Sequence, residues 1–237
     1  YYYTLKGENL KDTIASQDNK FYKILKKLDK KKYRDENNIF KAEGEKFLKE
    51  NINFTKIIVM ESKYKYFEDK YNINQFNNLT ILKDELFEEI SNQETSQGVI
   101  VLYSKSLTSI NEIKGDVVIL DDVQDPGNIG TIIRTMEATA FKNLILTKGS
   151  VDVYNPKTVR ATMGGIFKLN IIYETPENII KFLKEDNYQV ISTLLDETSI
   201  NYDDVILKEK NAYIFGNEGH GITEIFVNST DVKAIIP

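Results

Sequence analysis

Cysteine is absent from this chain of 237 residues, and histidine occurs only once. Without thiols there is no disulfide bond and no cysteine nucleophile, and a single imidazole leaves no ligand set for a typical zinc site. Long apolar runs are missing as well, since none approaches the roughly 20 residues that a membrane-spanning helix needs. We therefore expect no metal cofactor, no membrane partner and a cytoplasmic location.

The N-terminal segment YYYTLKGENL has neither the charged start nor the apolar core of a signal peptide. It also has no initiator methionine. We expect these first residues to be disordered, or foreign to the natural protein, ahead of a folded domain.

Negative charge predominates over the whole chain, which carries 31 Lys and Arg against 36 Asp and Glu. Such a balance is not the overall signature of a nucleic-acid binder. One stretch, KFYKILKKLDKKKYR at residues 20–34, is nevertheless strongly basic. Its apolar residues fall at helical spacing, which leaves a basic opposite face. This face is either an ordinary solvated helix surface or an RNA phosphate contact, for which Lys23, Lys27 and Arg34 are the candidates.

The chain reads as two α/β segments joined by a polar linker. In the first segment, residues 1–105, apolar stretches at helical spacing alternate with short β-branched runs. We expect helices at 20–32, 44–50 and 83–90, and strands at 56–60, 79–82 and 98–103. A polar stretch that ends in glycine, SKSLTSINEIKG, follows, and residues 106–115 are assigned to the linker.

The second segment, residues 116–237, alternates more regularly. We expect strands at 116–120, 143–146, 168–173, 188–195 and 212–216, with another beginning at 232, and helices at 156–163, 176–184 and 221–227. Short apolar strands between helices predict a parallel sheet covered on both faces. In such sheets ligands bind beyond the carboxyl ends of the strands, so the loops that follow strands are the places to search.

The loop after the strand at 116–120 reads DDVQDPGN and leads directly into a helix. The four residues from Asp125 form a turn signal in which proline fixes φ and glycine supplies a positive φ, and Asn128 is then placed to cap the helix. Arg134 lies off the apolar stripe of this helix, among small residues that leave room for a ligand or another chain. The turn and the cap do not explain why an arginine is present here. The alternative to a functional role is a weak surface ion pair between Arg134 and Glu137.

Three glycines in six residues mark the loop after the strand at 212–216, GNEGHG. Glycine permits a close approach of backbone to a ligand, but the spacing matches neither the dinucleotide fingerprint nor the phosphate-binding P-loop. The plain interpretation is a flexible turn. In the functional interpretation, Glu218 binds a polar group of a ligand. His220 is expected to be a surface residue.

The stretch YNPKTVRATMGG, residues 154–165, places two cations on one face of a short helix. Lys157 and Arg160 are three residues apart, and this spacing suits a solvated face and a phosphate contact equally well. Both residues are kept as RNA-binding candidates.

Together these loops resemble the motifs of the SpoU (TrmH) family of RNA ribose 2′-O-methyltransferases, in the SPOUT superfamily. LDDVQDPGNIGTIIRTMEATAF resembles the first motif, AYIFGNEGHGI the second and VKAIIP the opening of the third, and SVDVYNPKTVRATMGGIF resembles the family between the first two. In the first segment, IASQDNKFYKILKKLDKKKYR, FKAEGEKFL and SQGVIVL resemble the family's additional RNA-binding domain, which has a ribosomal-protein-like α/β fold. The resemblance thus spans nearly the whole chain.

The resemblance implies an enzyme that uses S-adenosylmethionine, with a deep trefoil knot in its C-terminal domain and a catalytic site at a homodimer interface. By motif, the catalytic residues would be Asn128 and Arg134, with Glu218 supporting them. The cofactor would be held by Gly216, Asn217, Gly219 and Ile236, with Thr193 as an adenosine contact. The family's third motif continues past the proline into a Ser-x-Asn segment, so we expect further residues to follow Pro237 in the full protein.

Methyl transfer from a sulfonium is an in-line displacement with an already activated donor, so the enzyme mainly positions and polarises the nucleophile. The family assigns activation of the ribose 2′-hydroxyl to the arginine of the first motif. Because a guanidinium stays protonated to above pH ~12, our first interpretation is that Arg134 grips the substrate phosphate and stabilises the developing alkoxide. Proton abstraction by a deprotonated Arg134 is the alternative.

Ribosomal RNA is the favoured substrate, because the short relatives that act on tRNA usually lack the N-terminal domain. By family habit we expect the target to be a guanosine of large-subunit RNA. The alternatives are a tRNA ribose methyltransferase, an enzyme for an antibiotic-target nucleoside in ribosomal RNA, and a non-catalytic RNA-binding protein derived from a methyltransferase. The missing dinucleotide fingerprint excludes a nicotinamide oxidoreductase.

Overall fold

The computed structural model describes residues 13–49, 54–105 and 108–237. The chain divides into two compact units, one of residues 1–105 with 154–160 and the other of residues 106–153 with 161–237. The N-terminal segment that we expect to be disordered or foreign, and two residues of the expected linker, Ser106 and Leu107, lie outside the described residues.

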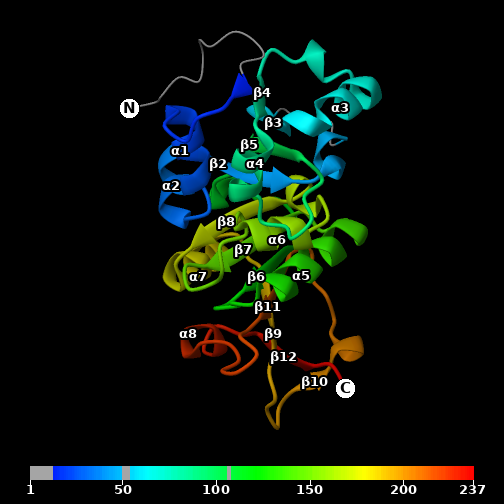
Figure 1. Cartoon of the computed structure of the whole chain (residues 1–237). Coiled ribbons are helices and arrows are strands. Elements are labelled where there is room, and N and C mark those ends of the chain that lie inside the picture. Colours follow the sequence, from blue (N-terminus) through cyan, green and yellow to red (C-terminus); the bar gives the residue numbers. More distant parts are fainter. Residues whose placement is uncertain (1–12, 50–53, 106–107) are drawn as a thin grey trace. The chain divides into compact units, whose positions relative to one another are not determined.

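The first unit is built on a five-stranded sheet in the order β1-β4-β3-β5-β2 (Figure 1). Its strands are β1 (Thr13–Ile14), β2 (Ile39–Glu43), β3 (Lys56–Met60), β4 (Leu79–Leu82) and β5 (Val99–Ser104). The pairs β1–β4 and β3–β4 are parallel, whereas β5 runs antiparallel to both β3 and β2. The three strands expected in this unit are present, and β1 and β2 are additional.

Helices cover this sheet. They are α1 (Lys20–Lys27), α2 (Lys31–Asn37), α3 (Tyr64–Tyr71) and α4 (Asp84–Ile90), with short 3-10 turns at η1 (Glu45–Leu48), η2 (Glu61–Lys63) and η3 (Ile73–Gln75). α1 and α4 pack on the same face, where Leu25 and Phe87 join Ile58 and Ile100 of the sheet in one apolar cluster. The unit therefore has a core of its own.

Two expectations for this unit are wrong in detail. The single helix expected over 20–32 is two helices, because α1 ends at Lys27. Its C-cap is Leu28, whose backbone carbonyl accepts a hydrogen bond of 2.7 Å from the guanidinium of the buried Arg34. The helix expected over 44–50 is only the turn η1, and Glu50 lies outside the described residues. Gly44 precedes this turn with φ of 127°, a conformation that favours glycine.

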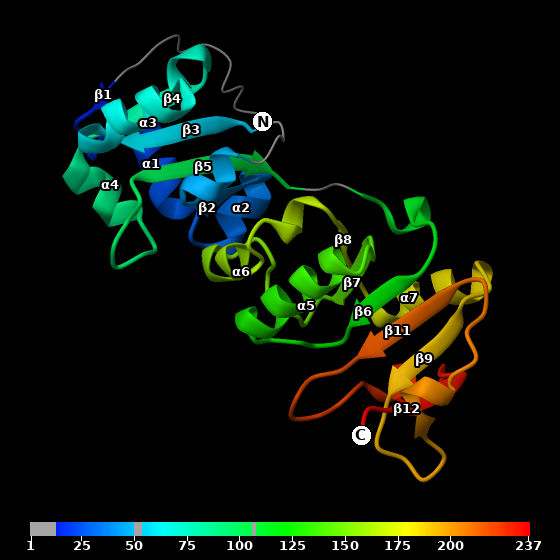
Figure 2. The ribbon, with the colours of Figure 1, turned by 90° about the vertical axis from the view of Figure 1, so that its right-hand side faces the viewer.

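The second unit contains a seven-stranded sheet in the order β10-β12-β9-β11-β6-β7-β8, in which every pairing is parallel. Its strands are β6 (Val117–Leu120), β7 (Asn143–Thr147), β8 (Asn170–Glu174), β9 (Gln189–Thr193), β10 (Ile200–Asn201), β11 (Asn211–Phe215) and β12 (Val232–Ile235). The α/β fold with a parallel sheet is thereby confirmed. Figure 2 shows β6, β11, β9 and β12 side by side.

Both faces of the second sheet carry helices. They are α5 (Pro126–Ala138), α7 (Pro176–Glu185) and α8 (Glu224–Val227), with 3-10 turns at η4 (Ile110–Glu112), η5 (Gly165–Phe167) and η6 (Tyr202–Asp204). α6 (Pro156–Ala161) falls at the division between the units. α7 and α8 bury Phe182 and Phe226 against Val117 and Ile119 of β6. Because side chains alternate along a strand, Val118 faces the opposite side, toward α5.

All strands of this sheet point the same way, so their carboxyl ends meet at one edge. The register pairs Leu120 of β6 with Phe215 of β11, and Thr193 of β9 with Ala234 of β12. The loops that carry the first and second motifs, and the strand that opens the third, therefore reach the same edge of the sheet.

Candidate active site

The first motif begins α5 in a way that differs from our expectation. Asp125 is the N-cap: its carboxylate accepts a hydrogen bond of 2.8 Å from the backbone N–H of Asn128, and Pro126 occupies the first turn. Gly127 is helical rather than in a positive-φ turn, and a Cβ there would lie 2.9 Å from the capping carboxylate. Since Asp125 caps the helix, the side chain of Asn128 is available for another contact.

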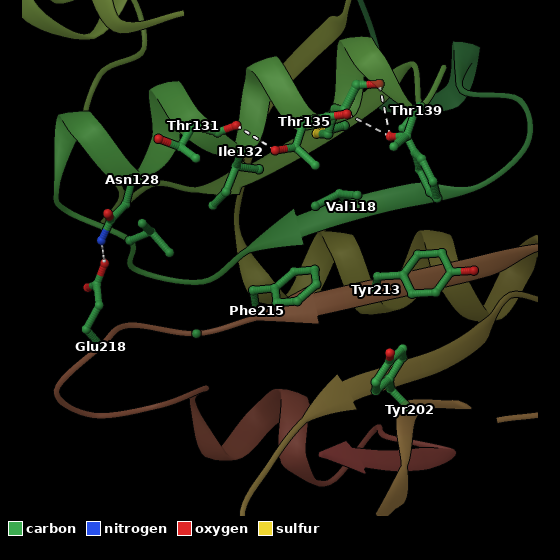
Figure 3. Close-up of a pocket in the computed structure, with 14 residues that line it drawn as sticks. Val118, Asn128, Thr131, Ile132, Thr135, Thr139, Tyr202, Tyr213, Phe215 and Glu218 are labelled. Carbon is green, nitrogen blue, oxygen red and sulfur yellow. Dashed lines mark hydrogen bonds between the residues drawn. The ribbon is translucent and has the colours of Figure 1, made fainter. Parts of the chain in front are cut away.

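That contact is with the second motif. The side-chain amide of Asn128 donates a hydrogen bond to the carboxylate of Glu218, which lies in the loop after β11 (Figure 3). The two residues come from loops at the carboxyl ends of adjacent strands, β6 and β11. The fold thus brings together two of the three residues expected to be catalytic.

The loop after β11 is held in shape by its own polar groups. The side-chain oxygen of Asn217 accepts hydrogen bonds from the backbone N–H groups of Gly219 (2.7 Å) and His220 (3.3 Å), and its amide donates to the carbonyl of Asp122 at 2.9 Å. A Cβ at Gly216 would lie 2.2 Å from the backbone carbon of Gly221. The glycines therefore permit a tight loop, and the side chain of Asn217 serves its folding.

A cavity of about 810 Å³ opens beside this pair of loops, between α5 and the sheet (Figure 3). Its wall is mostly apolar and aromatic, and Asn128, Gly216 and Glu218 supply polar groups at one end. The rest of the lining is Val118, Val123, Thr131, Ile132, Thr135, Met136, Thr139, Phe141, Tyr202, Tyr213 and Phe215.

Arg134 stands apart from this cavity. It is solvent-exposed on α5 and does not line the cavity. Its guanidinium forms no hydrogen bond or ion pair with any residue in the described part of the chain, so the surface ion pair with Glu137 that we considered is not formed. An uncommitted cation on a helix that begins in the active-site loop remains available to an external anion.

The expected cofactor residues lie at the same edge of the sheet. Thr193 ends β9, and its hydroxyl donates to the carbonyl of Ile214 at 3.3 Å. Two large apolar side chains follow the ends of the paired strands β9 and β12: Leu195 is 98% exposed and Ile236 is 67% exposed. Sequence reasoning missed Leu195, because an apolar residue next to a buried strand reads as part of that strand.

An ion pair stabilises the loop after β9. The ammonium of Lys233 on β12 lies 2.8 Å from one carboxylate oxygen of Asp196. The other oxygen accepts hydrogen bonds from the backbone N–H and the hydroxyl of Thr198. Lys233 and Thr198 hold the pKa of Asp196 well below its usual range. The loop that follows Leu195 is therefore tied to the strand that opens the third motif.

The basic N-terminal stretch is less available than its sequence indicates. Lys23 pairs with Asp18 at 2.8 Å, and the ammonium of Lys27 lies 5.2 Å from the centre of the Tyr33 ring, both at the surface. Arg34 is only 2% exposed, so our assignment of Arg34 as an RNA contact is wrong, because its side chain belongs to the core. Lys157 and Arg160 on α6 are both exposed.

Two searches concern other kinds of site. Within the described ranges, no group of three or more His, Cys, Asp or Glu side chains is arranged to hold a metal ion. Among the same residues, no helix combines the length and the apolar character that crossing a membrane requires.

The comparisons with known proteins cover both units. Residues 116–237 match the SpoU rRNA Methylase family, and residues 19–101 match the MRM3-like substrate binding domain. The chain is 29% identical over 227 residues to the 23S rRNA (guanosine(2553)-2′-O)-methyltransferase RlmP of Bacillus subtilis, covering 94% of this chain and 90% of that protein.

Solved structures give the same result. A crystal structure of an rRNA methyltransferase from Sinorhizobium meliloti aligns with a TM-score of 0.84 and 26% identity, covering 95% of this chain and 89% of that one. The AdoMet-bound structure of an rRNA methyltransferase from the same organism aligns with a TM-score of 0.83 and 26% identity, covering 95% and 88%. Since the family model matches just over half of its residues, the chain belongs to the SpoU rRNA methylase family.

Proposed function

We propose that the protein transfers a methyl group from S-adenosylmethionine to the 2′-oxygen of a ribose in ribosomal RNA, at a guanosine of the large subunit. The observation that carries this proposal is the hydrogen bond between Asn128 and Glu218, which joins the first and second motifs where parallel strands end. A polar pair at this edge lies where α/β sheets bind their ligands.

The residues at this edge fit S-adenosylmethionine. Leu195 and Ile236 expose apolar surface just beyond the ends of the paired strands β9 and β12, and such surface suits the flat faces of an adenine ring. Gly216, Asn217 and Gly219 lie in the loop after β11, the neighbour of β9, and Thr193 lies at the end of β9. The backbone of Gly216 is proposed to contact the cofactor, while Asn217 and the N–H of Gly219 shape the loop. When bound, the cofactor supplies a methyl group that a sulfonium has already made electrophilic.

Arg134 is proposed to act on the RNA. A guanidinium is a permanent cation with a planar set of donors, which suits a phosphate and a developing alkoxide better than it suits proton abstraction. In this structure Arg134 has no partner among the described residues, so gripping a phosphate would break no existing contact. Glu218, oriented by Asn128, would hold a polar group of the substrate or cofactor.

We further propose that the protein acts as a homodimer. Asn128 and Glu218 line the cavity and Arg134 does not, so the three catalytic candidates do not face one another within one chain. A second copy whose Arg134 approaches this Asn128–Glu218 pair would complete the set. The trefoil knot belongs to the same proposal, as an implication of the family resemblance.

The first unit is proposed to select the RNA. It matches a substrate-binding domain model, and the chain aligns over nearly its whole length with an enzyme named for a 23S rRNA guanosine. Lys23 and Lys27 on α1, and Lys157 and Arg160 on α6, are proposed as phosphate contacts. Ribosomal RNA as substrate agrees with a cytoplasmic location.

The test is methyl transfer in vitro. Purified protein is incubated with S-adenosylmethionine labelled in its methyl group and with ribosomal RNA from cells lacking the gene, and nucleosides are then identified by mass spectrometry. We expect one new 2′-O-methylguanosine in the large-subunit RNA. If tRNA is also supplied and only tRNA is labelled, the substrate is tRNA. If the protein binds RNA and transfers no methyl group, the non-catalytic alternative is favoured.

A further inference from the structure

Asp121, the residue directly after β6, is a buried carboxylate that the proposed chemistry does not use. Its exposed fraction is 1%. The side chain accepts one hydrogen bond, 2.7 Å long, from the backbone N–H of Thr223, and it forms no ion pair with any described residue. Burying a polar side chain is costly unless it is hydrogen-bonded, so the contact with Thr223 is what the structure gains from a carboxylate in this place.

The contact connects the two motif loops. Thr223 is the N-cap residue of α8 and closes the loop that begins at Gly216. The backbone of Asp121 bonds the same region, since its N–H donates to the carbonyl of Phe215 at 2.9 Å. The backbone carbonyl of the next residue, Asp122, accepts a hydrogen bond of 2.9 Å from the side-chain amide of Asn217. Both ends of the loop are thus tied to two consecutive residues of one strand end.

Glu218 lies between these ties. The turn from Asn217 to Gly221 is closed on itself by two backbone hydrogen bonds between Asn217 and Gly221, 2.9 and 2.8 Å long. Its shape is therefore internal, and what the ties to Asp121 and Asp122 fix is its placement against the end of β6. If the far end were released, the placement of this closed turn against the end of β6 would rest on the contact between Asn217 and Asp122, and Glu218 would move with the turn. Asp122 itself has a left-handed backbone, with φ of 55°, a conformation that aspartate tolerates better than most non-glycine residues.

We propose that Asp121 is a positioning residue, whose carboxylate holds the loop of residues 216–223 so that Glu218 and the cofactor-binding backbone stay in place. This inference rests on the proposed function for its consequence in catalysis. The geometry of the tie stands independently of it, because it involves only residues of this chain.

Three substitutions separate positioning from a general structural role. Asp121→Asn keeps an oxygen that can accept from Thr223, whereas Asp121→Leu keeps the branched outline of the side chain, with methyl groups in place of oxygens, and removes the acceptor. Thr223→Pro removes the donor, and it suits the backbone because φ at Thr223 is −69°. In the double variant Asp121→Leu/Thr223→Pro, no backbone donor is left unsatisfied, so thermal stability should recover while the loop stays untied.

The measurements use the full chain. S-adenosylmethionine binding is measured by calorimetry, and hydrogen exchange is measured on peptides covering residues 216–223. Asp121→Asn should bind the cofactor within about threefold of the parent protein, whereas Asp121→Leu should bind about tenfold more weakly or worse, the scale of one lost charge-assisted hydrogen bond. Exchange in the loop should accelerate by a similar factor, with peptides of β7 and β8 unchanged.

The outcomes distinguish this inference from the proposed function. Asp121→Leu with parental cofactor affinity and parental loop exchange would overturn the positioning role, whether or not the enzyme methylates RNA. Recovery of cofactor affinity along with stability in the double variant would also overturn it, since the effect would then be structural only. A parent protein that binds no S-adenosylmethionine, combined with faster loop exchange in Asp121→Leu, would leave the tie standing and refute the proposed cofactor.

Discussion

Asn128 and Glu218 are separated by 90 residues of sequence, and the amide of the first donates a hydrogen bond to the carboxylate of the second. Replacing Asn128 by Asp should reduce methyl transfer about tenfold or more, because two carboxylates would then face each other. Adding Glu218→Gln should restore part of the activity, since the glutamine amide can donate in the reverse direction. Initial rates of transfer are the measurement.

The chain offers a matched control for this exchange. On α7, the amide of Asn178 donates to Glu174 at 3.0 Å, and this pair follows the edge strand β8, away from β6 and β11. Asn178→Asp creates the same repulsion without touching the site, so its rate should equal that of the parent. A rate loss at Asn178 as large as that at Asn128 would contradict the site assignment.

Arg134→Ala should lower the rate of methyl transfer by about 10²- to 10³-fold, the range seen when one donor that stabilises a developing oxyanion is removed. S-adenosylmethionine affinity should not change, because Arg134 lies on α5 and is not among the residues proposed to hold the cofactor. Lys181→Ala removes an exposed cation from α7 and serves as the control, with parental rates expected.

A mixing experiment locates the arginine. If Arg134 serves the partner's site, then Arg134→Ala and Glu218→Ala chains, each inactive alone, should together recover about one quarter of the parental activity after random exchange of subunits in a symmetric dimer. If Arg134 serves its own chain, each subunit of the mixed dimer lacks one group and no activity returns. Activity after mixing is compared with that of each variant alone.

Asp125→Ala should lower stability by about 1 kcal/mol, because it removes the N-cap of α5. The melting temperature should fall by about 2–4 °C, and Asp125→Ser should recover most of it. Because Asn128 lies in the turn that would fray, the transfer rate should fall as well. A melting curve identical to that of the parent would contradict the capping assignment.

Glu45 is expected to make the stability of the first unit depend on pH in acid. Lys70, Tyr71 and Tyr66 donate hydrogen bonds to it, and these lower its pKa from 4.5 to about 2. Above pH 4.5 its contribution to stability is fully present. It is lost as the pH falls from 4.5 toward 2, because the unfolded state takes up the proton first. Denaturant unfolding of Glu45→Gln should therefore depend less on pH in this range than that of the parent. Glu61→Gln, at a more exposed ion pair, is the control.

Lys41 is a buried cation in β2, 2% exposed, whose ammonium lies 2.7 Å from Asp29 and donates to the carbonyl of Ile90 at 2.9 Å. Lys41→Ala should destabilise the unit by about 3 kcal/mol, the lower end for breaking a buried pair, since Asp29 is partly hydrated. Lys41→Met should cost less, because it keeps the packing of the stem. The measurement is the midpoint of denaturant unfolding. The slope of unfolding free energy against denaturant concentration should not change.

The parts of the fold that could be predicted are those set by local pattern. The runs KIIVM and LTIL became β3 and β4 with the expected limits, because short runs of apolar and β-branched residues between polar stretches favour a strand. The break between α1 and α2 could not be predicted. It depends on Arg34 reaching the carbonyl of Leu28, a contact that only the folded unit creates.

The candidate site divides in the same way. Turn chemistry pointed to the region of Asp125 and Asn128 but assigned the cap to the wrong residue, since both are good caps and spacing alone does not choose between them. The pairing of Asn128 with Glu218 depends on β11 lying beside β6, and this order of strands is not encoded in any local pattern. Asp121 was passed over, because a carboxylate at a strand end ordinarily faces water.

Gly130 lies in the middle of α5, where a Cβ would be 2.4 Å from the methyl carbon of Ala161. A side chain of any size at position 130 would push α5 away from Ala161, the last residue of α6. Asn128 and Arg134 belong to the same helix, so a shift of α5 would displace both side chains together. The positions of two proposed catalytic side chains thus depend on a residue that has no side chain. Even one added carbon at position 130 would shift both of them relative to a bound substrate.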